Sequence, residues 1–441
     1  MTERYIVVGA GSAGCVVAAR LSEDAGREVL LLEAGPNLVE GSVPAAIAGP
    51  NAFAALAEPG RTYPELFATR ITGGEPSLYR RGRGVGGSST VNAMIAIRGD
   101  PRQYDGWGWT GVEDAWSAML LPEEPARDDE LGVVDRALLA AAPDAETALL
   151  NRRHGQRVTS AEAYLWPALP RETLTLRSNT PVDRVMLDGP RATGVRTSDG
   201  ETLMADHVVL AAGAIHTPAI MLRSGIVAPG IGQRLQDHPS APFALEFRAG
   251  IEQDSNGLAV GSFLTRDDLQ FLPMNHLGSD APGMGLLMVA LMRPLGRAGT
   301  VRLSSDDPLD DPVVDLALLQ DRRDLVAMSH GVRDALELLT SSSFDAIVSN
   351  VYIDGWGTTI AQLTDDLSIE RWLQSATGDY VHASSTSAMG TTVDERGSVV
   401  GYEGLYVCDA SVFPSIPTVN THLPTTMLAE RLTARWRAEP D

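Results

Sequence analysis

The chain has 441 residues, 44% of them hydrophobic, so it is long enough for two closely associated domains rather than one of about 150 residues. Its formal net charge of -22, from 35 basic and 57 acidic side chains, repels polyphosphates and argues against a nucleic-acid partner. It has only two cysteines, no basic segment leading into a long apolar one, and no apolar run of about 18 residues, which predicts a cytoplasmic protein without disulfides, cleavable signal or membrane span.

The opening predicts a strand, a helix and a second strand, at Tyr5 to Val8, Cys15 to Leu21 and Glu28 to Leu32, an order that favours a parallel sheet. A G-x-G-x-x-G turn joins the first strand to the helix and lets a pyrophosphate approach backbone N–H groups. Glu33 ends the second strand, where a carboxylate can accept hydrogen bonds from ribose hydroxyls. These features predict a dinucleotide site without distinguishing FAD from NAD. The residues assigned to it are Gly9, Gly11, Ser12, Ala13, Gly14, Glu33 and Ala34.

The middle of the chain alternates between glycine-rich loops and strand-like runs. Residues 36–77 are rich in Gly, Pro and Ala, which indicates a long excursion over a ligand. From Leu174 to Leu210, β-branched residues alternate with polar ones around two Asp-Gly turns and predict hairpins that lead into a strand. Gly213 then turns the chain, and Pro218 suits the first turn of the following helix.

The C-terminal half predicts a second domain, after which the pattern of a strand followed by a helix that opened the chain appears again. Strand-like runs within residues 241–316 and a helical pattern from Asp321 to Leu339 predict an antiparallel sheet with helices. Leu405 to Val407 predicts a further strand, and Thr425 to Trp436 predicts an amphipathic helix. The fold class expected is therefore α/β, with a Rossmann-like domain and a second domain of antiparallel sheet plus helices.

Motifs spread over most of the chain resemble the signatures of the glucose-methanol-choline (GMC) flavoenzymes. Gly82 to Met94 is similar to the first family signature, a glycine and serine loop, and Gly213 to Ile226 is similar to the second. Gly230 to Pro239 is similar to the segment that follows the second signature. The segments that resemble the flavin-facing C-terminal part of the family are His382 to Gly390, Cys408 to Pro414 and Asn420 to Thr421.

The resemblance implies that the dinucleotide is FAD, bound by a discontinuous domain of residues 1–105, 165–240 and 378–441. Residues 241–377 then bind the substrate, and residues 106–164 form a linker or cap that is shorter than usual in the family. Some members attach FAD through a histidine where this chain has Val91, so non-covalent FAD is expected. The further cofactor-binding residues implied are Arg83, Gly86, Gly87, Ser88, Asn92, Ala93, Met94, Val182, Ala212, Gly213, Asp409, Ala410, Thr421 and His422.

Removing a hydride from an alcohol requires a base for the hydroxyl proton and a donor that holds the oxygen. In the family pattern these positions are His382 and Asn420. Because an amide cannot take a proton, His382 is predicted to be the base and Asn420 the orienting group. The alternatives are a loop histidine satisfied by backbone groups and an asparagine that caps the next helix. His422 fits a site role and a supporting role equally, whereas His216 and His238 are assigned structural roles.

The electron acceptor is predicted from Tyr380, two residues before the base, where a bulky side chain would hinder oxygen. A dehydrogenase with a quinone-like or peptide-derived acceptor is expected rather than an efficient oxidase. The sequence around His382 and Asn420 is also similar to that of actinobacterial members of the family, including those associated with the peptide-derived cofactor mycofactocin. The expected partners are a small-molecule alcohol and this acceptor, with no metal. The alternatives are an NAD-linked dehydrogenase and a catalytically silent flavin-binding protein.

Overall fold

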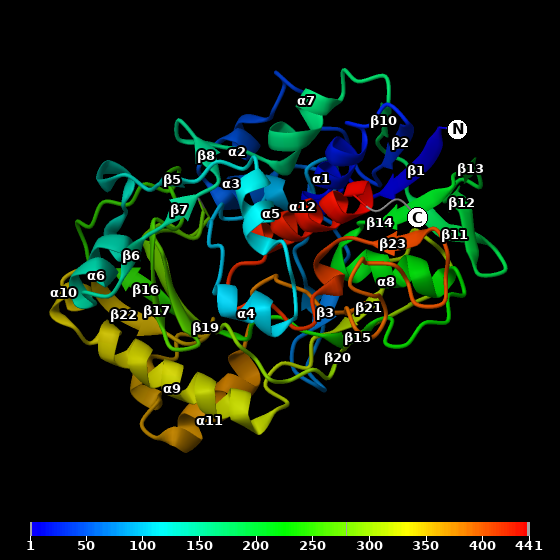
Figure 1. Ribbon diagram of the computed structural model, residues 1–441. Helices are drawn as coiled ribbons and strands as arrows, with labels where there is room; N and C mark the ends of the chain where they lie inside the picture. Colours follow the sequence, from blue (N-terminus) through cyan, green and yellow to red (C-terminus); the bar gives the residue numbers. More distant parts are fainter. Residues whose placement is uncertain (1, 279, 439–441) are drawn as a thin grey trace.

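A five-stranded parallel sheet organises one part of the computed structural model, which describes residues 2–278 and 280–438 (Figure 1). Val7, Leu31 and Val209 in its central strands are completely buried, as expected for a parallel sheet covered on both faces. Both ends of the chain contribute strands, which confirms the predicted Rossmann-like arrangement. In spatial order the strands are β10 (Leu174–Arg177), β2 (Arg27–Leu32), β1 (Glu3–Val8), β14 (His207–Leu210) and β23 (Leu405–Val407).

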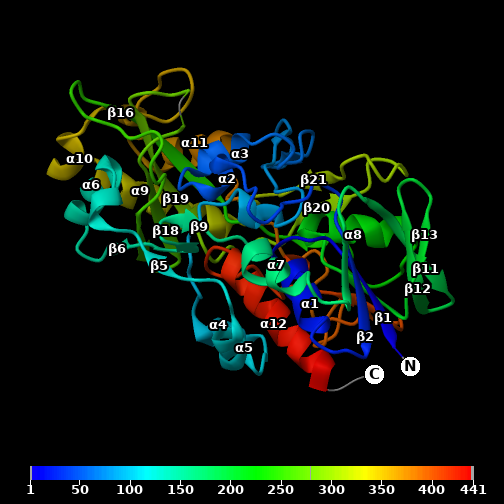
Figure 2. The same ribbon diagram turned by 90° about the horizontal axis from the view of Figure 1, so that it is seen from above.

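Two helices from opposite ends of the chain, α1 (Ser12–Leu21) and α12 (His422–Ala438), lie side by side (Figures 1 and 2). Helix α12 begins before the predicted start at Thr425, and its predicted amphipathic character is wrong. Every residue of α12 from 423 to 433 is buried, because α1 and α5 (Val112–Ala118) pack against it. Polar side chains within this stretch therefore need partners inside the protein.

Helix α8 (Gly213–Arg223) begins well before Pro218, so the prediction that this proline occupies the first turn is wrong. A proline inside a helix leaves the carbonyl four residues earlier without its N–H donor. That carbonyl belongs to Ala214, and the Thr386 hydroxyl donates to it at 2.7 Å. A tertiary hydrogen bond thus compensates for the missing helical one.

The predicted hairpins begin later than Leu174. Strand β10 pairs in parallel with β2 in the central sheet and takes no part in a hairpin. The hairpins are formed by the strands that follow it, which make a separate antiparallel sheet. These are β11 (Val182–Asp188), β12 (Arg191–Thr197) and β13 (Thr202–Met204).

A six-stranded antiparallel sheet confirms the predicted second architecture. In spatial order its strands are β22 (Val348–Tyr352), β16 (Ser240–Phe247), β19 (Met284–Leu291), β18 (Leu269–Met274), β17 (Ser262–Arg266) and β6 (Glu146–Thr147). Three helices, α6 (Val133–Ala141), α9 (Arg322–Leu339) and α11 (Asp366–Ala376), pack against it (Figure 1). Side chains alternate along a strand, so Phe271 and Val289 join the core under the helices. Their neighbours Leu272 and Met288, which are directly paired, lie on the opposite face.

A mixed five-stranded sheet joins segments that the predicted domain boundaries separate. It consists of β15 (Gln233–Leu235), β20 (Gly299–Arg302), β21 (Val313–Asp315), β3 (Phe67–Thr69) and β4 (Ser77–Leu78). Val301 and Val314 of this sheet belong to the same hydrophobic core as the parallel sheet. Conversely, α6 and β6 come from the predicted linker and pack in the second part. The boundaries therefore stay a prediction, and the packing interleaves the segments that they define.

The remaining elements are short and lie mainly in the connecting segments. Among the described residues, no helix has both the length and the apolar composition needed to cross a bilayer. The short helices are α2 (Ala45–Ala48), α3 (Ala52–Ala57), α4 (Pro101–Gly106), α7 (Trp166–Ala168) and α10 (Ser342–Asp345). The short strand pairs are β5 (Glu124–Pro125) with β7 (Leu149–Leu150) and β8 (Arg152–Arg153) with β9 (Gln156–Arg157).

Candidate functional site

A cavity of about 840 Å³ lies where the carboxyl ends of the parallel strands meet. Val8 ends β1, Glu33 follows β2, and Ala211 follows β14 at its wall. Open α/β sheets bind their ligands at this edge. Most of the predicted site residues line the cavity: Gly9, Gly11, Ser12, Ala13, Glu33, Ala34, Arg83, Gly87, Ser88, Asn92, Ala93, Met94, Val182, Ala212, Gly213, His382, Asp409, Ala410, Asn420, Thr421 and His422.

The two glycine turns touch each other at one end of the cavity. A Cβ on Gly87 would lie 2.7 Å from the Cα of Gly11, so backbone from both turns forms a single surface. Gly14 and Gly86 were predicted to bind the cofactor but are not among the lining residues. A Cβ on Gly14 would lie 1.7 Å from the Gly9 carbonyl oxygen, and Gly86 has a positive φ of 95°. Both glycines therefore shape the turns.

Glu33 ties the glycine turns together. Its Oε2 accepts a hydrogen bond from the Ala10 N–H at 2.8 Å. Its Oε1 accepts from the Gly35 and Gly84 N–H groups at 2.9 and 3.0 Å. The carboxylate is buried, but Oε2 accepts a single hydrogen bond here and has a further lone pair, and the side chain lines the cavity. Glu33 can therefore organise the turns and also accept from ribose hydroxyls.

Asp409 connects β23 to the start of helix α8. Its Oδ2 accepts from the Gly213 N–H at 2.8 Å and from the Thr217 hydroxyl at 2.6 Å. Its Oδ1 accepts from the Ser411 N–H at 2.8 Å. A carboxylate at this helix end is stabilised by the helix dipole, although burial raises its pKa. The predicted contact between Asp409 and the cofactor stays a prediction.

A buried histidine pair fixes the tautomer of His382. The Nε2 of His238 lies 2.9 Å from the Pro417 carbonyl oxygen, which can only accept, so this nitrogen carries the proton. Burial lowers the pKa of His238 to about 3, so the ring is neutral and its Nδ1 is an acceptor. That Nδ1 lies 2.9 Å from the Nδ1 of His382, which must therefore donate. The hydrogen-bond network thus leaves the Nε2 of His382 with a lone pair.

Asp237 holds the backbone of the segment that carries His382. Its Oδ1 accepts from the His382 N–H at 2.9 Å, and its Oδ2 accepts from the Tyr79 hydroxyl at 2.6 Å. The Tyr79 hydroxyl accepts in turn from the Ala383 N–H at 3.0 Å. Just before these anchored residues, Val381 has a φ of +53°, a strained conformation for a β-branched residue, and Arg81 donates to its carbonyl.

Neither Asp237 nor Tyr79 was predicted as a site residue, and His238 was assigned a structural role. A signal was present, because Asp237 and His238 lie in a segment that resembles the family. The ring nitrogens of His238 and His382 and a carboxylate oxygen of Asp237 include atoms within 4.8 Å of one another, a grouping that could bind a metal ion. These side chains already form hydrogen bonds with each other and with backbone groups. We therefore interpret them as a network that positions His382.

Buried polar atoms without partners lie where a cofactor would contact the protein. Among the described residues, the Oδ1 of Asn420 and the Nε2 of His422 have no hydrogen-bond partner, and both side chains line the cavity. The other ring nitrogen of His422 lies 3.1 Å from the Ser12 hydroxyl. Such atoms are costly unless a ligand satisfies them, so the residues present fit a polar group that fills this space.

Arg157 is a buried cation behind this wall, and no sequence signal singled it out. It donates to the carbonyl oxygen and Oδ1 of Asn92 at 2.7 and 2.6 Å. Among the described residues it forms no ion pair, and burial lowers its pKa to about 9. Burial, assisted by the charge of Arg157, lowers the pKa of His422 to about 4. The cavity therefore experiences an uncompensated positive charge from behind Asn92.

The part of the cavity nearest His382 is apolar. The ring of Tyr380 lies 4.9 Å from that of His382 and packs with a separate hydrophobic cluster. We call this region the apolar chamber, and six side chains that line it are Phe53, Met94, Ile95, Leu272, Met274 and Met288.

Two family models described as GMC oxidoreductase match most of the chain. One covers residues 3–134 and 140–240, and the other covers residues 294–429. The chain is 31% identical to an oxygen-dependent choline dehydrogenase from Paraburkholderia phymatum, over 98% of this chain and 92% of that protein. It is also 31% identical to a 5-(hydroxymethyl)furfural oxidase from Methylovorus sp., over 97% of each chain.

Solved structures have the same fold. A pyridoxine 4-oxidase from Mesorbium loti superposes with a TM-score of 0.89 at 22% identity, over 100% of both chains. A variant of formate oxidase from Aspergillus oryzae RIB40, studied for FAD modification, has a TM-score of 0.86 at 20% identity, over 100% of this chain and 99% of that one. At these identities the likeness concerns the fold alone.

Proposed function

The chain belongs to the GMC oxidoreductase family, whose members are FAD-dependent enzymes acting on alcohols, and on this premise we propose that His382 is the base of an alcohol oxidation. Membership argues against the alternative of an NAD-linked dehydrogenase, and the alternative of a catalytically silent protein is an outcome of the experiment below. When bound, FAD accepts the hydride that leaves the alcohol carbon. The Nε2 lone pair of His382 takes the hydroxyl proton, so the alcohol becomes a carbonyl and both transferred hydrogens are accounted for.

The observation that carries this proposal is the tautomer of His382. A general base needs a free lone pair that faces the substrate. Because the Nδ1 of His382 donates its hydrogen bond to His238, the Nε2 carries the free lone pair, and the side chain lines the cavity. Burial, His238 and Arg81 hold the pKa of His382 well below its usual value, so the ring is neutral and able to accept.

Asn420 is proposed to orient the alcohol. It lines the cavity just before helix α12, and its buried Oδ1, which has no hydrogen-bond partner among the described residues, supports a contact with substrate or cofactor. An amide can donate to the alcohol oxygen but cannot remove its proton. The alternative role as a helix cap receives no support, because no hydrogen bond from the Asn420 side chain to the first turn is present among the described residues.

The decisive experiment is anaerobic mixing of the holoenzyme with an alcohol panel while flavin absorbance is followed. We expect His382→Ala to slow flavin reduction by about 10²- to 10⁴-fold and Asn420→Ala by less. His154→Ala, at an exposed turn, is the control for expression and flavin content. Wild-type reduction rates in both site variants, at full flavin content, would refute the assignment.

We further propose a dehydrogenase rather than an efficient oxidase, with a quinone-like or peptide-derived acceptor, in the cytoplasm. Buried Tyr380 supports this, because its ring lines the cavity beside His382 and its hydroxyl is held by Gln270 at 2.9 Å. Its bulk is expected to hinder oxygen. Both cysteines are free and buried, which fits a reducing compartment.

The acceptor is tested by stopped-flow reoxidation of the reduced enzyme. Air-saturated buffer should reoxidise it slowly and an artificial quinone rapidly. Tyr380→Ala should gain oxygen reactivity, whereas Tyr380→Phe, which keeps the ring, should not. Peroxide production that matches substrate turnover in the wild type would show the proposal to be wrong.

A further inference from the structure

The apolar chamber receives its walls from a helix, a loop and a pair of strands. Phe53 comes from α3, Met94 from the loop after the second glycine turn, and Leu272 and Met288 from paired positions on β18 and β19. Because side chains alternate along a strand, the pairing directs this face of the sheet away from the helices. Tyr380 joins the chamber to His382. A substrate whose hydroxyl reaches His382 therefore places its remaining atoms against hydrocarbon and thioether groups.

None of the acidic side chains at the cavity provides a free carboxylate in this chamber. Glu33 and Asp409 are held by backbone N–H groups at the cofactor end. Asp379 forms an ion pair with Arg70 at 2.6 Å. Of the other acidic residues in the described lining, Glu65 is exposed to solvent, Asp310 accepts from Ser305, and Asp311 contacts His216.

A positive charge also acts on the reacting end, where the buried carboxylate of Asp237 is held by the His382 N–H and the Tyr79 hydroxyl. Arg81 donates to the carbonyl of Val381, the residue before His382, and its charge helps to lower the pKa of His382. Like charges repel, so a cationic substrate would be disfavoured here by the same field.

Two aromatic rings are present, but they do not form a cage for a cation. The Tyr380 ring meets the His382 ring edge-on, at 84°, and the Phe53 ring packs against His276 at 5.6 Å. A cation over an aromatic face gains less than it loses when it is buried without a counter-ion. A neutral apolar group incurs no such cost and gains from burial.

We propose that the substrate is an uncharged alcohol with an apolar body, and that the apolar chamber discriminates against quaternary ammonium alcohols. This inference rests on the proposed function, because it assumes that the reacting hydroxyl lies at His382. It concerns this chain alone, since the named relatives oxidise alcohols of different chemistry according to their names.

The test uses pairs of alcohols that differ only in charge. The first pair is choline and 3,3-dimethylbutan-1-ol, and the second is 4-(trimethylammonio)benzyl alcohol and 4-tert-butylbenzyl alcohol. Anaerobic stopped-flow reduction of the holoenzyme gives a second-order rate constant for each. We expect the neutral member of at least one pair to react faster than its cationic partner by a factor on the order of 10 to 100.

The outcomes separate this inference from the proposed function. Equal or faster reduction by the cationic members would overturn the inference, as would a flavin that only charged or polyhydroxylated alcohols reduce. A flavin that no alcohol reduces would instead refute the proposed function itself.

A charge placed in the chamber provides the matched variants. Met288→Glu supplies a carboxylate, and Met288→Gln has the same shape without the charge. The rate constant for choline divided by that for 3,3-dimethylbutan-1-ol should be at least about tenfold higher in Met288→Glu than in Met288→Gln. An unchanged ratio in two variants that retain flavin would argue that Met288 does not face the substrate and would overturn the chamber assignment. If either variant loses flavin, the wild-type pairs alone decide.

Discussion

His238 sets which nitrogen of His382 is free, because its own Nε2 proton is committed to the Pro417 carbonyl. In His238→Leu the His382 ring loses its hydrogen-bond acceptor and can change tautomer. We expect anaerobic flavin reduction to slow by on the order of 10- to 100-fold, part of the range for general-base catalysis. His238→Gln offers an amide oxygen in place of the imidazole nitrogen and should retain more of the rate. Equal rates in the two variants would contradict a positioning role.

The pH dependence of flavin reduction follows from the same residue pair. The base must be unprotonated, and burial, His238 and Arg81 hold the pKa of His382 well below 6.5. A lowered pKa keeps the neutral ring populated in acid, so the rate should stay constant as the pH falls to 6.5 and decline only below it. Removing a nearby positive charge in Arg81→Met should move the decline to higher pH. A wild-type titration centred at or above 6.5 would contradict this assignment.

Arg157 should favour a cofactor that gains negative charge on reduction. Its guanidinium is buried without an ion pair among the described residues, and its field reaches His422. Arg157→Met should therefore lower the midpoint potential of the bound flavin by on the order of tens of millivolts, equivalent to a few kcal/mol or less for a two-electron couple. Arg157→Lys keeps the charge and is the matched control. Potentiometry that finds equal values for both variants would count against an electrostatic role.

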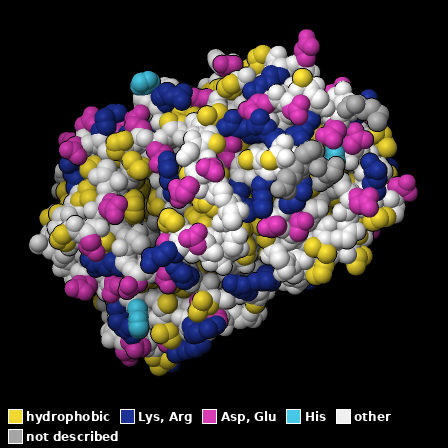
Figure 3. All heavy atoms as spheres, viewed as in Figure 1, with side chains coloured by type: hydrophobic (Ala, Val, Ile, Leu, Met, Phe, Trp, Pro, Cys, Tyr) yellow, Lys and Arg dark blue, Asp and Glu magenta, His cyan; other side chains and the backbone are white. Residues whose placement is uncertain are grey.

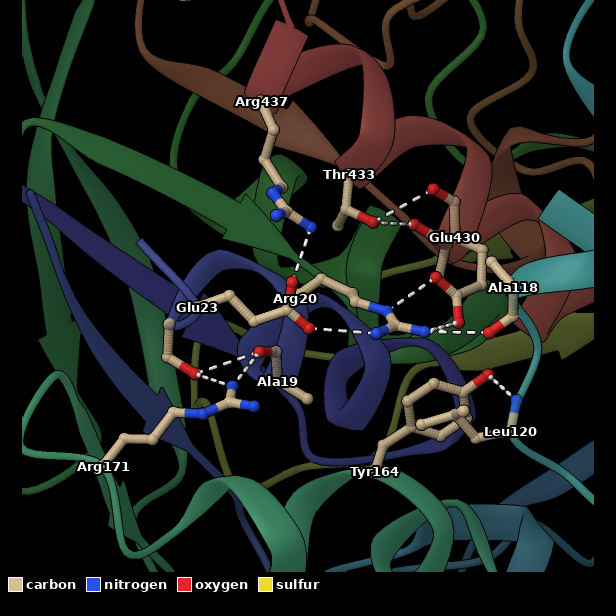
Figure 4. Close-up of polar contacts among 12 residues, drawn as sticks. Ala19, Arg20, Glu23, Ala118, Leu120, Tyr164, Arg171, Glu430, Thr433 and Arg437 are labelled. Carbon is tan, nitrogen blue, oxygen red and sulfur yellow. Dashed lines mark hydrogen bonds and ion pairs between the residues drawn. The ribbon is translucent and has the colours of Figure 1, made fainter. Parts of the chain in front are cut away.

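At the scale of elements, helices α1 and α12 are joined by a buried ion pair (Figure 4). The guanidinium of Arg20 donates to both oxygens of Glu430 at 2.8 Å and to the Ala118 carbonyl at 2.8 Å. The ring of Tyr164 lies 5.6 Å from the guanidinium carbon. Glu430 is 4% exposed and, within the part of the chain that the structure describes, pairs with Arg20, so its charge depends on this arginine for compensation.

Breaking this pair should destabilise the docking of α12. Arg20→Met leaves Glu430 buried without its partner and should cost on the order of 3 kcal/mol, seen as a lower Tm at a fixed scan rate. The double variant Arg20→Met/Glu430→Leu removes both charges and should recover much of the loss. A double variant no more stable than Arg20→Met would indicate that the ion pair is not the relevant interaction. Arg102→Met, at an exposed pair, is the control.

At the scale of the whole molecule, FAD should be removable and should stabilise the fold. Val91 offers no ring for a covalent link, and the cavity is lined by segments from both ends of the chain. Acid treatment should therefore release intact FAD, and the apoprotein should have a lower Tm that added FAD restores. A hundredfold excess over the dissociation constant corresponds to about 2.7 kcal/mol of stabilisation. Flavin retained on the denatured polypeptide would disprove non-covalent binding.

The net charge of the molecule does not describe the charge around its cavity. The chain carries a formal charge of -22, yet acidic and basic side chains are intermixed on the face shown in Figure 3. Arg70, Arg80 and Arg81 all line the cavity. Net charge describes the long-range field, whereas folding decides the sign of the charge beside the substrate.

The sequence by itself determined the parallel sheet, the glycine turns and many of the residues that meet at the cofactor end of the cavity. These features depend on local rules. At position 87 only glycine fits, because its φ is positive and an added Cβ would lie 2.7 Å from the Cα of Gly11, and Glu33 directly follows the second strand of the sheet. The order of the family motifs could also be recognised in the sequence, because each motif is a continuous segment of the chain.

Only the tertiary structure decided the tautomer of His382, the burial of Arg157 without an ion pair among the described residues, the burial of residues 423–433 of α12 and the apolar character of the chamber. His238 and His382 lie 144 residues apart, and Arg157 and Asn92 lie 65 apart, so no local pattern could pair them. The periodicity of α12 predicted an exposed face, but α1 and α5 cover it. Side-chain environment is set by what packs from elsewhere in the chain, and that information appears only when distant segments meet.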